Sequence, residues 1–309
     1  MKTLLIESVE HPSLTQIHDG LRHATGTCEV YTLTSDHLEN MERFFQRFIR
    51  LEQYDRIVLQ LSQQIIYEQS PFLRQLPYIC FLSFNEVFTS ADRHRLMQNM
   101  NVMPWARLIS DDFSIIKWQM ECGHDAHWLK PIYNPSTYPL PRKPSAELTC
   151  YIYEPSGRFY EMRGRQLSAM AMKTLEIADV GDELALLGNG DLFVCLPEYI
   201  EDSSRLIIRA MAYGAVVITL DPGSEQRLRY GWQNTRNCIF VSKVEEIIPM
   251  LGVLSDQKET RLEIAAEAKK HIENFYPFTV GQMLGAVLLK PIRKAADYPR
   301  KTRVFGFEI

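Results

Sequence analysis

The sequence contains no run of apolar residues that approaches the roughly 20 needed to span a bilayer. The apolar stretch near its N-terminus, within MKTLLIESVEHPS, is far shorter than the core of a signal peptide. Its six cysteines show no C-x-x-C spacing, so neither a zinc site nor a disulfide framework is indicated. We therefore expect a cytoplasmic protein without a zinc site, whose thiols act as small apolar side chains.

An excess of basic charge is also absent. The net charge of −4 and the pI near 6.1 give no reason to expect a nucleic-acid partner. The C-terminal tail is the local exception, because six basic residues gather there: Lys290, Arg293, Lys294, Arg300, Lys301 and Arg303. This tail is either a solvated surface or a patch that contacts anionic lipid at the inner face of the membrane, at about 1 kcal/mol per basic residue.

A third absence concerns glycine. No G-x-G-x-x-G follows the first strand-like segment of either half of the chain, which weighs against a Rossmann-type enzyme with a dinucleotide cofactor. The sequence instead alternates short apolar strands with helical patterns, which predicts an α/β fold with mostly parallel, doubly wound sheets. The 309 residues suit two domains.

A proline-rich segment, NPSTYPLPRKPS, divides the chain. Prolines stiffen a chain toward an extended form and exclude regular helix, so residues 134–147 are the predicted linker. We expect Rossmann-like domains at residues 1–133 and 148–280, with residues 281–309 crossing back or forming the basic tail. The elements that matter below are predicted helices at 13–24, 38–53, 165–177 and 203–213, and predicted strands at 128–132, 191–196 and 215–220.

The most informative segment is DLFVCLPEYIEDSSRLIIRAMAYGAVVITLD, from Asp191 to Asp221. It reads as a strand, a polar loop, a helix that ends at Gly214, and a second strand. The loop places Glu201, Ser203 and Ser204 at the mouth of the helix, where outward-pointing N–H groups attract anions. Taken alone, Glu201 is better explained as a helix-dipole or capping residue, and only the surrounding pattern favours a ligand.

This segment resembles the nucleotide-sugar site of retaining GT-B glycosyltransferases similar to glycosyltransferase family 4. Their pattern, P-S-x-x-E-x7-E-A-M-A-x-G-x-P-V-I, aligns without a gap to the residues from Pro197 to Ile218, with Arg209 in place of the second glutamate. The resemblance implies two Rossmann-like domains that face a cleft. It also implies that Glu201 holds a hydroxyl of the donor sugar, and that the amides of Ser203 and Ser204 face its phosphates.

A second match precedes the first by about forty residues. Gly157-Arg158 and Arg163-Gly164 correspond to the glycine-arginine and lysine-glycine pairs of the family. Transfer leaves a nucleoside diphosphate, and two cations beside it stabilise the charge that develops as the glycosidic bond breaks. The resemblance therefore implies that Arg158 and Arg163 hold the diphosphate; the alternative is two exposed loop arginines.

Arg209 is the main departure from the family pattern. The glutamate there accepts hydrogen bonds from the ribose, whereas arginine has donors only. Three alternatives follow: Arg209 binds ribose or phosphate as a donor, a neighbour such as Glu225 supplies the carboxylate, or the site is degraded.

The first domain matches only in layout. Its loop after the first strand lacks glycine and the cleft histidine is missing, which leaves His11, Asn85 and Glu86 as candidates for contacts with the acceptor.

The resemblance implies transfer of a sugar from a nucleotide-sugar donor to a glycan or glycolipid acceptor, with retention and without a metal. It also implies a role in the synthesis of surface polysaccharide or lipopolysaccharide. The rival from another class is a catalytically degraded GT-B protein that serves as a binding or partner subunit.

Overall fold

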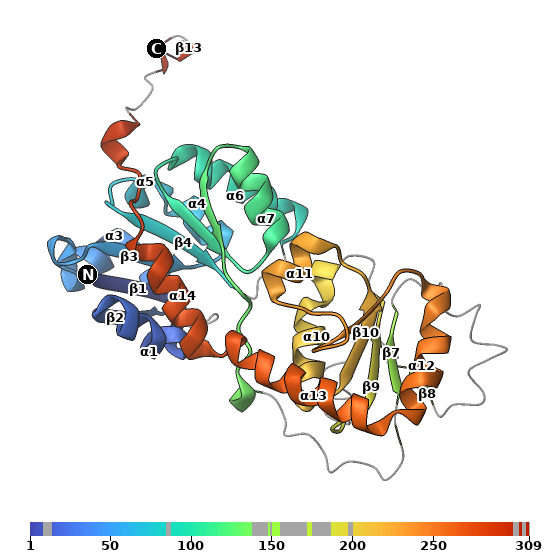
Figure 1. The fold of residues 1–309 in the computed structure, drawn as a ribbon. Helices are drawn as coiled ribbons and strands as arrows, with labels where there is room; N and C mark the ends of the chain where they lie inside the picture. The colour runs from blue at the N-terminus through green and yellow to red at the C-terminus, as the bar shows by residue number, and fades with distance from the viewer. Residues whose placement is uncertain are drawn as a thin grey trace. The chain divides into compact units, whose positions relative to one another are not determined.

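The computed structural model describes residues 1–8, 14–84, 88–137, 148, 150–154, 172–174, 187–196, 200–298, 303–304 and 307–308. The chain divides into two compact units (Figure 1). The first comprises Met1–Ile132 together with Pro277–Ile309, and the second comprises Tyr133–Tyr276.

The first unit is built on a six-stranded parallel sheet with the order β2-β1-β3-β4-β5-β6. Its strands are β1 Lys2–Ser8, β2 Thr27–Leu33, β3 Arg56–Gln60, β4 Ile79–Ser83, β5 Arg107–Ser110 and β6 Asp125–Trp128. Its helices are α1 Leu14–Thr25, α2 Ser35–Glu39, α3 Met41–Phe48, η1 Leu51–Gln53, α4 Gln63–Glu68, α5 Ser70–Leu73, α6 Ser90–Val102, α7 Phe113–Glu121, α14 Pro277–Leu289 and η7 Ala295–Asp297. A two-residue pair, β12 Arg303–Val304 and β13 Phe307–Glu308, follows them.

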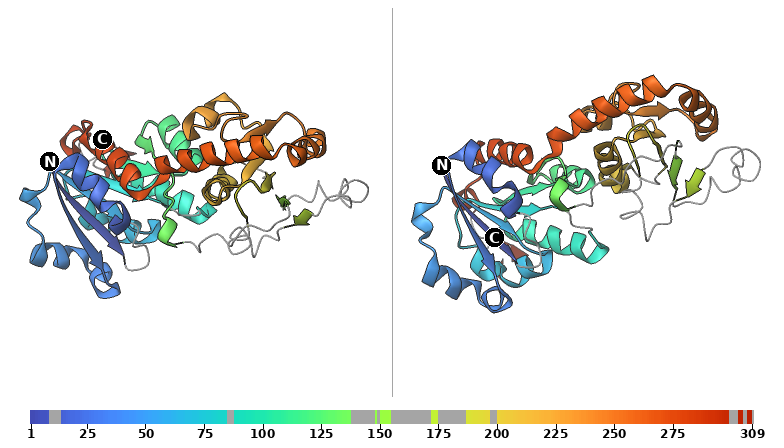
Figure 2. Two further views of the ribbon diagram at one scale, coloured as in Figure 1. Left: turned by 60° about the horizontal axis from the view of Figure 1, so that its bottom comes forward. Right: turned by 90° about the horizontal axis from the view of Figure 1, so that it is seen from below.

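Both faces of this sheet are covered by helices. One face packs against α3 to α7, through side chains such as Phe45, Leu96 and Ile116. The other packs against α1 and α14, where Leu21 and Leu284 belong to one buried cluster with Val58. The dark-blue α1 and the red α14 lie side by side in Figure 1 and in both views of Figure 2. The last long helix of the chain therefore completes the core that the first residues begin.

The second unit has a five-stranded parallel sheet with the order β11-β10-β9-β7-β8. Its strands are β7 Cys150–Tyr153, β8 Met172–Thr174, β9 Leu192–Cys195, β10 Val216–Leu220 and β11 Ile239–Val241. Its helices are η2 Pro135–Thr137, α10 Ile200–Tyr213, α11 Ser224–Tyr230, η5 Val244–Glu246, α12 Ile247–Asp256, α13 Lys258–Ile272 and η6 Glu273–Phe275. The predicted α/β class with two Rossmann-like units is confirmed.

Three predicted elements differ. The helix expected at 38–53 is broken at Asn40, whose side chain accepts from the amide of Arg43 at 3.0 Å and so starts a new helix. The strand expected at 128–132 instead spans Asp125–Trp128, because polar residues of this edge strand pair with β5. Met172–Thr174, inside the helix expected at 165–177, forms β8, because pairing with β7 overrides local helix propensity.

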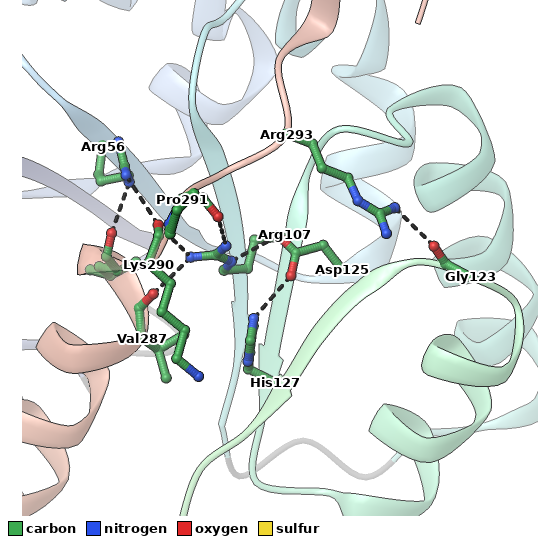
Figure 3. A network of polar contacts seen from close by, with 10 residues as sticks. Arg56, Arg107, Gly123, Asp125, His127, Val287, Lys290, Pro291 and Arg293 are labelled. Carbon is green, nitrogen blue, oxygen red and sulfur yellow. Dashed lines mark hydrogen bonds and ion pairs between the residues drawn. The ribbon is translucent and has the colours of Figure 1, made fainter. Parts of the chain in front are cut away.

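A polar network fixes the end of α14 to the amino edge of the first sheet (Figure 3). Arg107, only 2% exposed, donates to the carbonyls of Val287 at 2.7 Å and Lys290 at 3.2 Å, and also to that of Pro291. Arg56 donates to the carbonyls of Leu288 at 2.9 Å and Lys290 at 3.3 Å. Guanidinium groups thus satisfy carbonyls that the helix leaves unpaired at its negative end.

Asp125 balances the charge of this network. It accepts from Arg107 Nε and from His127 Nε2, both at 2.9 Å. Burial raises the pKa of Asp125, but the hydrogen bond from His127 and the charge and hydrogen bond of Arg107 lower it more. The carboxylate is therefore held ionised in the folded protein.

We predict that acid lowers the free energy of unfolding in part by protonating Asp125. A pKa lowered by folding stabilises the protein above the ordinary carboxyl pKa, near 3.9, and this stabilisation disappears as the pH falls through the folded value. Asp125→Asn should therefore be less stable than wild type at pH 7, with a difference that shrinks below about pH 4. Urea unfolding of both proteins from pH 7 to pH 3 measures it, and a difference independent of pH would contradict the assignment.

Candidate functional site

The order of strands in the second sheet creates a topological switch point. The chain leaves β7 toward β8 on one side, and β9, β10 and β11 follow on the other. The connections that follow β7 and β9 therefore run in opposite directions from this point of the sheet. Open α/β sheets bind ligands at such a point, beyond the carboxyl ends of the strands. The segments that follow Tyr153 and Cys195 start at this edge.

The register shows that the strand ends are level. Tyr153 of β7 pairs with Cys195 of β9, and Cys195 pairs with Thr219 of β10. Adjacent strands lie about 4.8 Å apart, so the connections after these three residues start within a short span of sheet edge. Gly157, Arg158 and Arg163 belong to the segment that follows β7 but lie outside the described residues.

Helix α10 starts from the same edge and begins at Ile200, three residues earlier than predicted. Glu201 and Ser203 are therefore inside its first turn rather than in a loop before it. The N–H groups of that turn have no partner within the helix and carry the positive end of its dipole. Ser204 lies just past the first turn, and its side chain is buried.

Arg209 lies about 12 Å along α10 from Glu201, given the rise of 1.5 Å per residue. Its Nε donates to the hydroxyl of Tyr213 at 3.4 Å, and its guanidinium carbon is 5.8 Å from the centre of that ring. Tyr213 is buried, so its side chain fixes where the half-buried arginine can point.

Two carboxylates follow β10. Asp221 is 41% exposed, and its Oδ1 accepts from the amide of Gly223 at 2.9 Å and lies 3.5 Å from Arg227 Nε. Glu225 is 70% exposed and pairs with Arg229 at 2.9 Å, one turn along α11. Asp221 is therefore the acidic residue nearer the strand end.

The first sheet has a switch point of its own, between β1 and β3. His11 follows β1, and Asn85 and Glu86 follow β4, but all three lie outside the described residues. The strand ends beside them carry a row of buried polar side chains that sequence reasoning missed: Glu7, Ser8, Gln60, Ser83 and Asp111. These polar side chains lie at the carboxyl ends of the strands, the edge at which open α/β sheets bind ligands.

Glu7 is the centre of this row. It pairs in register with Thr32 of β2 and Gln60 of β3, and the Thr32 hydroxyl donates to its Oε1 at 3.1 Å. The sequence marks each member separately, since acidic and amide residues end otherwise apolar strands, but it does not show that these residues meet.

Three further observations concern metals, thiols and membranes. Among the described residues, no group of three or more His, Cys, Asp or Glu side chains is arranged to hold a metal ion. Burial raises the pKa of the Cys80, Cys150 and Cys238 thiols to about 12, as expected of apolar rather than reactive cysteines. No helix in the described part of the chain is long and apolar enough to cross a membrane.

No protein-family model and no curated protein matches the sequence. Solved structures do match its fold. The chain is similar to HepE of Anabaena, solved in complex with UDP-glucose, with 14% identity and a TM-score of 0.56 over 93% of this chain and 99% of HepE. The two parallel sheets of this chain fit the two Rossmann-like domains of GT-B proteins. A glycosyltransferase from Rickettsia africae matches at 9% identity and a TM-score of 0.53, over 94% of this chain and 99% of its own.

A third match is of another kind. A chain of the glycosylation-associated protein (Gap123) complex of Streptococcus agalactiae matches at 12% identity with a TM-score of 0.54. The match covers 82% of this chain and 57% of that one. At these identities the likeness concerns the fold, and the chemistry has to be argued from the residues.

Proposed function

We propose that the protein is a glycosyltransferase that moves a sugar from a nucleotide-sugar donor to a hydroxyl of a glycan or glycolipid acceptor, with retention at the anomeric carbon. The observation that carries this proposal is the β7–β9 switch point of the second sheet. There the start of α10 and the arginine-bearing segment after β7 leave one sheet edge. The GT-B fold, which HepE shares, supports the same reading.

The chemistry follows from charge. Loss of the sugar leaves a diphosphate, which the positive start of α10 stabilises together with Arg158 and Arg163. Arginine grips phosphate through two parallel hydrogen bonds, so the protein's own side chains perform the neutralisation that a metal ion performs elsewhere. Glu201 orients the donor sugar through a hydroxyl.

The acceptor belongs to the first unit in this proposal. The candidates for contacts with the acceptor are His11, Asn85 and Glu86, which follow strand ends at the same sheet edge as the buried polar row around Glu7. The pathway that fits is the synthesis of surface polysaccharide or lipopolysaccharide in the cytoplasm. Contact of the basic tail with the inner face of the membrane is part of the same proposal.

A nucleotide panel tests the proposal. We expect at least one of ADP, GDP and UDP to raise the unfolding temperature of the purified protein, equally with and without EDTA. A ligand at 100 times its Kd stabilises a fold by about 2.7 kcal/mol, which is a shift of several degrees. Arg158→Ala and Arg163→Ala should each abolish the shift, while Arg236→Ala, an exposed residue paired with Glu267, should keep it.

Each outcome of the panel separates the possibilities. No shift with any nucleotide at millimolar concentration would rule out nucleotide-dependent transfer. A shift that survives both arginine changes would show that the diphosphate binds elsewhere. Slow hydrolysis of a nucleotide sugar by the wild-type protein supports catalysis directly.

A second candidate function is a GT-B subunit that binds a glycan or a partner glycosyltransferase without turnover. Two observations favour it: Arg209 replaces an acceptor with donors, and a chain of the Gap123 complex shares the fold. This candidate predicts no donor hydrolysis and no nucleotide shift, so the same panel decides between the two.

A further inference from the structure

Strand β10 lies beside β9, the strand that leads into α10 (Figure 1). Asp221 directly follows β10, twenty residues after Glu201. In dinucleotide-binding folds, an acidic residue about twenty residues after the phosphate-binding turn binds the ribose hydroxyls. We propose that Asp221 accepts hydrogen bonds from the ribose hydroxyls of the donor nucleotide, which Arg209 cannot do because it has no acceptor atom. This inference rests on the proposed function and names a specificity-determining residue for it.

The position of Asp221 is fixed by its backbone. Its amide donates to the carbonyl of Val241 in β11 at 2.9 Å, and the register of Thr219 with Cys195 fixes its level relative to β9. Asp221 is therefore two residues beyond the level at which β9 ends at Cys195. A nucleotide whose phosphates meet the start of α10 has its ribose within reach of this edge.

The carboxylate is also free to accept a ligand. Both of its contacts fall on Oδ1, from the amide of Gly223 and from Arg227. Oδ2 contacts no polar group in the described part of the chain. Gly223 makes this arrangement possible, because its φ of +86° turns the chain back toward Asp221. The space beside Gly223 is open, since no atom lies within 4 Å of where a Cβ would stand. A carboxylate that is fixed through one oxygen can accept hydrogen bonds from two adjacent sugar hydroxyls with the other.

The alternative residues are less well placed. Arg209 is turned toward Tyr213 and has no acceptor atom. Glu225 pairs with Arg229 and points along α11. Two residues before Asp221, the buried Thr219 hydroxyl has no hydrogen-bond partner among the described residues. An unsatisfied polar group so close to the strand end is an independent sign that a polar ligand or its water belongs there.

The test compares Asp221→Asn with wild type on two ligands. Asparagine keeps an oxygen for the Gly223 amide and removes the charge, so the turn survives. The ligands are whichever of ADP, GDP and UDP binds best and its 2′,3′-dideoxy analogue, measured by calorimetry. We expect Asp221→Asn to weaken the nucleotide about 10- to 100-fold, as for hydrogen bonds to a charged group. The dideoxy analogue should bind both proteins equally.

The controls keep the two proposals distinguishable. Glu267→Gln removes an exposed charge from α13 and should leave affinity unchanged. If Asp221→Asn lost the same affinity for both ligands, or for neither, the ribose assignment would be overturned. Binding of the nucleotide by the wild-type protein would still support the proposed function. If Glu225→Gln weakened nucleotide binding instead, Glu225 rather than Asp221 would be the carboxylate that binds the ribose. An unchanged unfolding temperature for Asp221→Asn establishes that the fold is intact.

Discussion

Arg107→Met is expected to lower the free energy of unfolding by about 3–5 kcal/mol, the usual cost of removing one partner of a buried ion pair. The guanidinium holds Asp125 at 2.9 Å and three carbonyls at the end of α14 (Figure 3). Methionine fills a similar volume but donates nothing, so a carboxylate and a helix end lose their partners together. Urea unfolding of the full chain at pH 7 measures the loss.

The matched control is Arg236→Met. That arginine pairs with Glu267 at 3.1 Å but is 63% exposed, so its removal should cost less than about 1 kcal/mol. If Arg107→Met cost no more than this control, the network would contribute little to stability. Replacing Arg107 and Asp125 together by apolar residues should cost less than replacing Arg107 alone, because no charge is left unpaired.

Gly281→Ala is expected to lower the free energy of unfolding by about 3 kcal/mol, at the upper end of overpacking costs. A Cβ at Gly281 would lie 2.3 Å from the carbonyl oxygen of Ile17, and one at Gly20 would lie 1.9 Å from that of Phe278. Helices α1 and α14 therefore touch backbone to backbone, and neither obstruction is a flexible side chain. Equilibrium unfolding and proteolysis after residue 276 measure the loss of this contact.

A glycine-to-alanine substitution in α12 should instead raise the free energy of unfolding. Gly252 lies in α12 with no atom within 4 Å of an added Cβ. Gly252→Ala should stabilise the protein by about 0.5–1 kcal/mol, because alanine loses less backbone entropy in a helix. Equal effects at Gly252 and Gly281 would show that the close approach of α1 and α14 does not limit stability.

The sequence predicts the alternation of strands and helices well where strands are apolar, as in β1, β4 and β10. It fails for β6, whose sequence Asp-Ala-His-Trp has no apolar pattern and is fixed by pairing with β5. It also fails at Asn40, where a single capping side chain divides a continuous apolar stripe. Both failures arise because a local hydrogen bond or a distant pairing outweighs periodicity.

The candidate site divides in the same way. The strand, turn and helix around Glu201 are predictable, because strand and helix patterns and a glycine stop mark them locally. The polar row around Glu7 is not, because its members lie far apart in sequence and meet only through the register of β1, β3 and β4. The roles of Arg158, Arg163, His11, Asn85 and Glu86 stay predictions.

The return of α14 to the first sheet has a consequence for biosynthesis. The second unit is complete once Tyr276 has left the ribosome, whereas the first lacks a helix until Leu289 has emerged. Until then, Val58 and its neighbours on that face have no cover from α14. During translation the second unit can therefore reach its native state first, while residues of the first unit that were synthesised before it, such as Val58, are among the last to be buried.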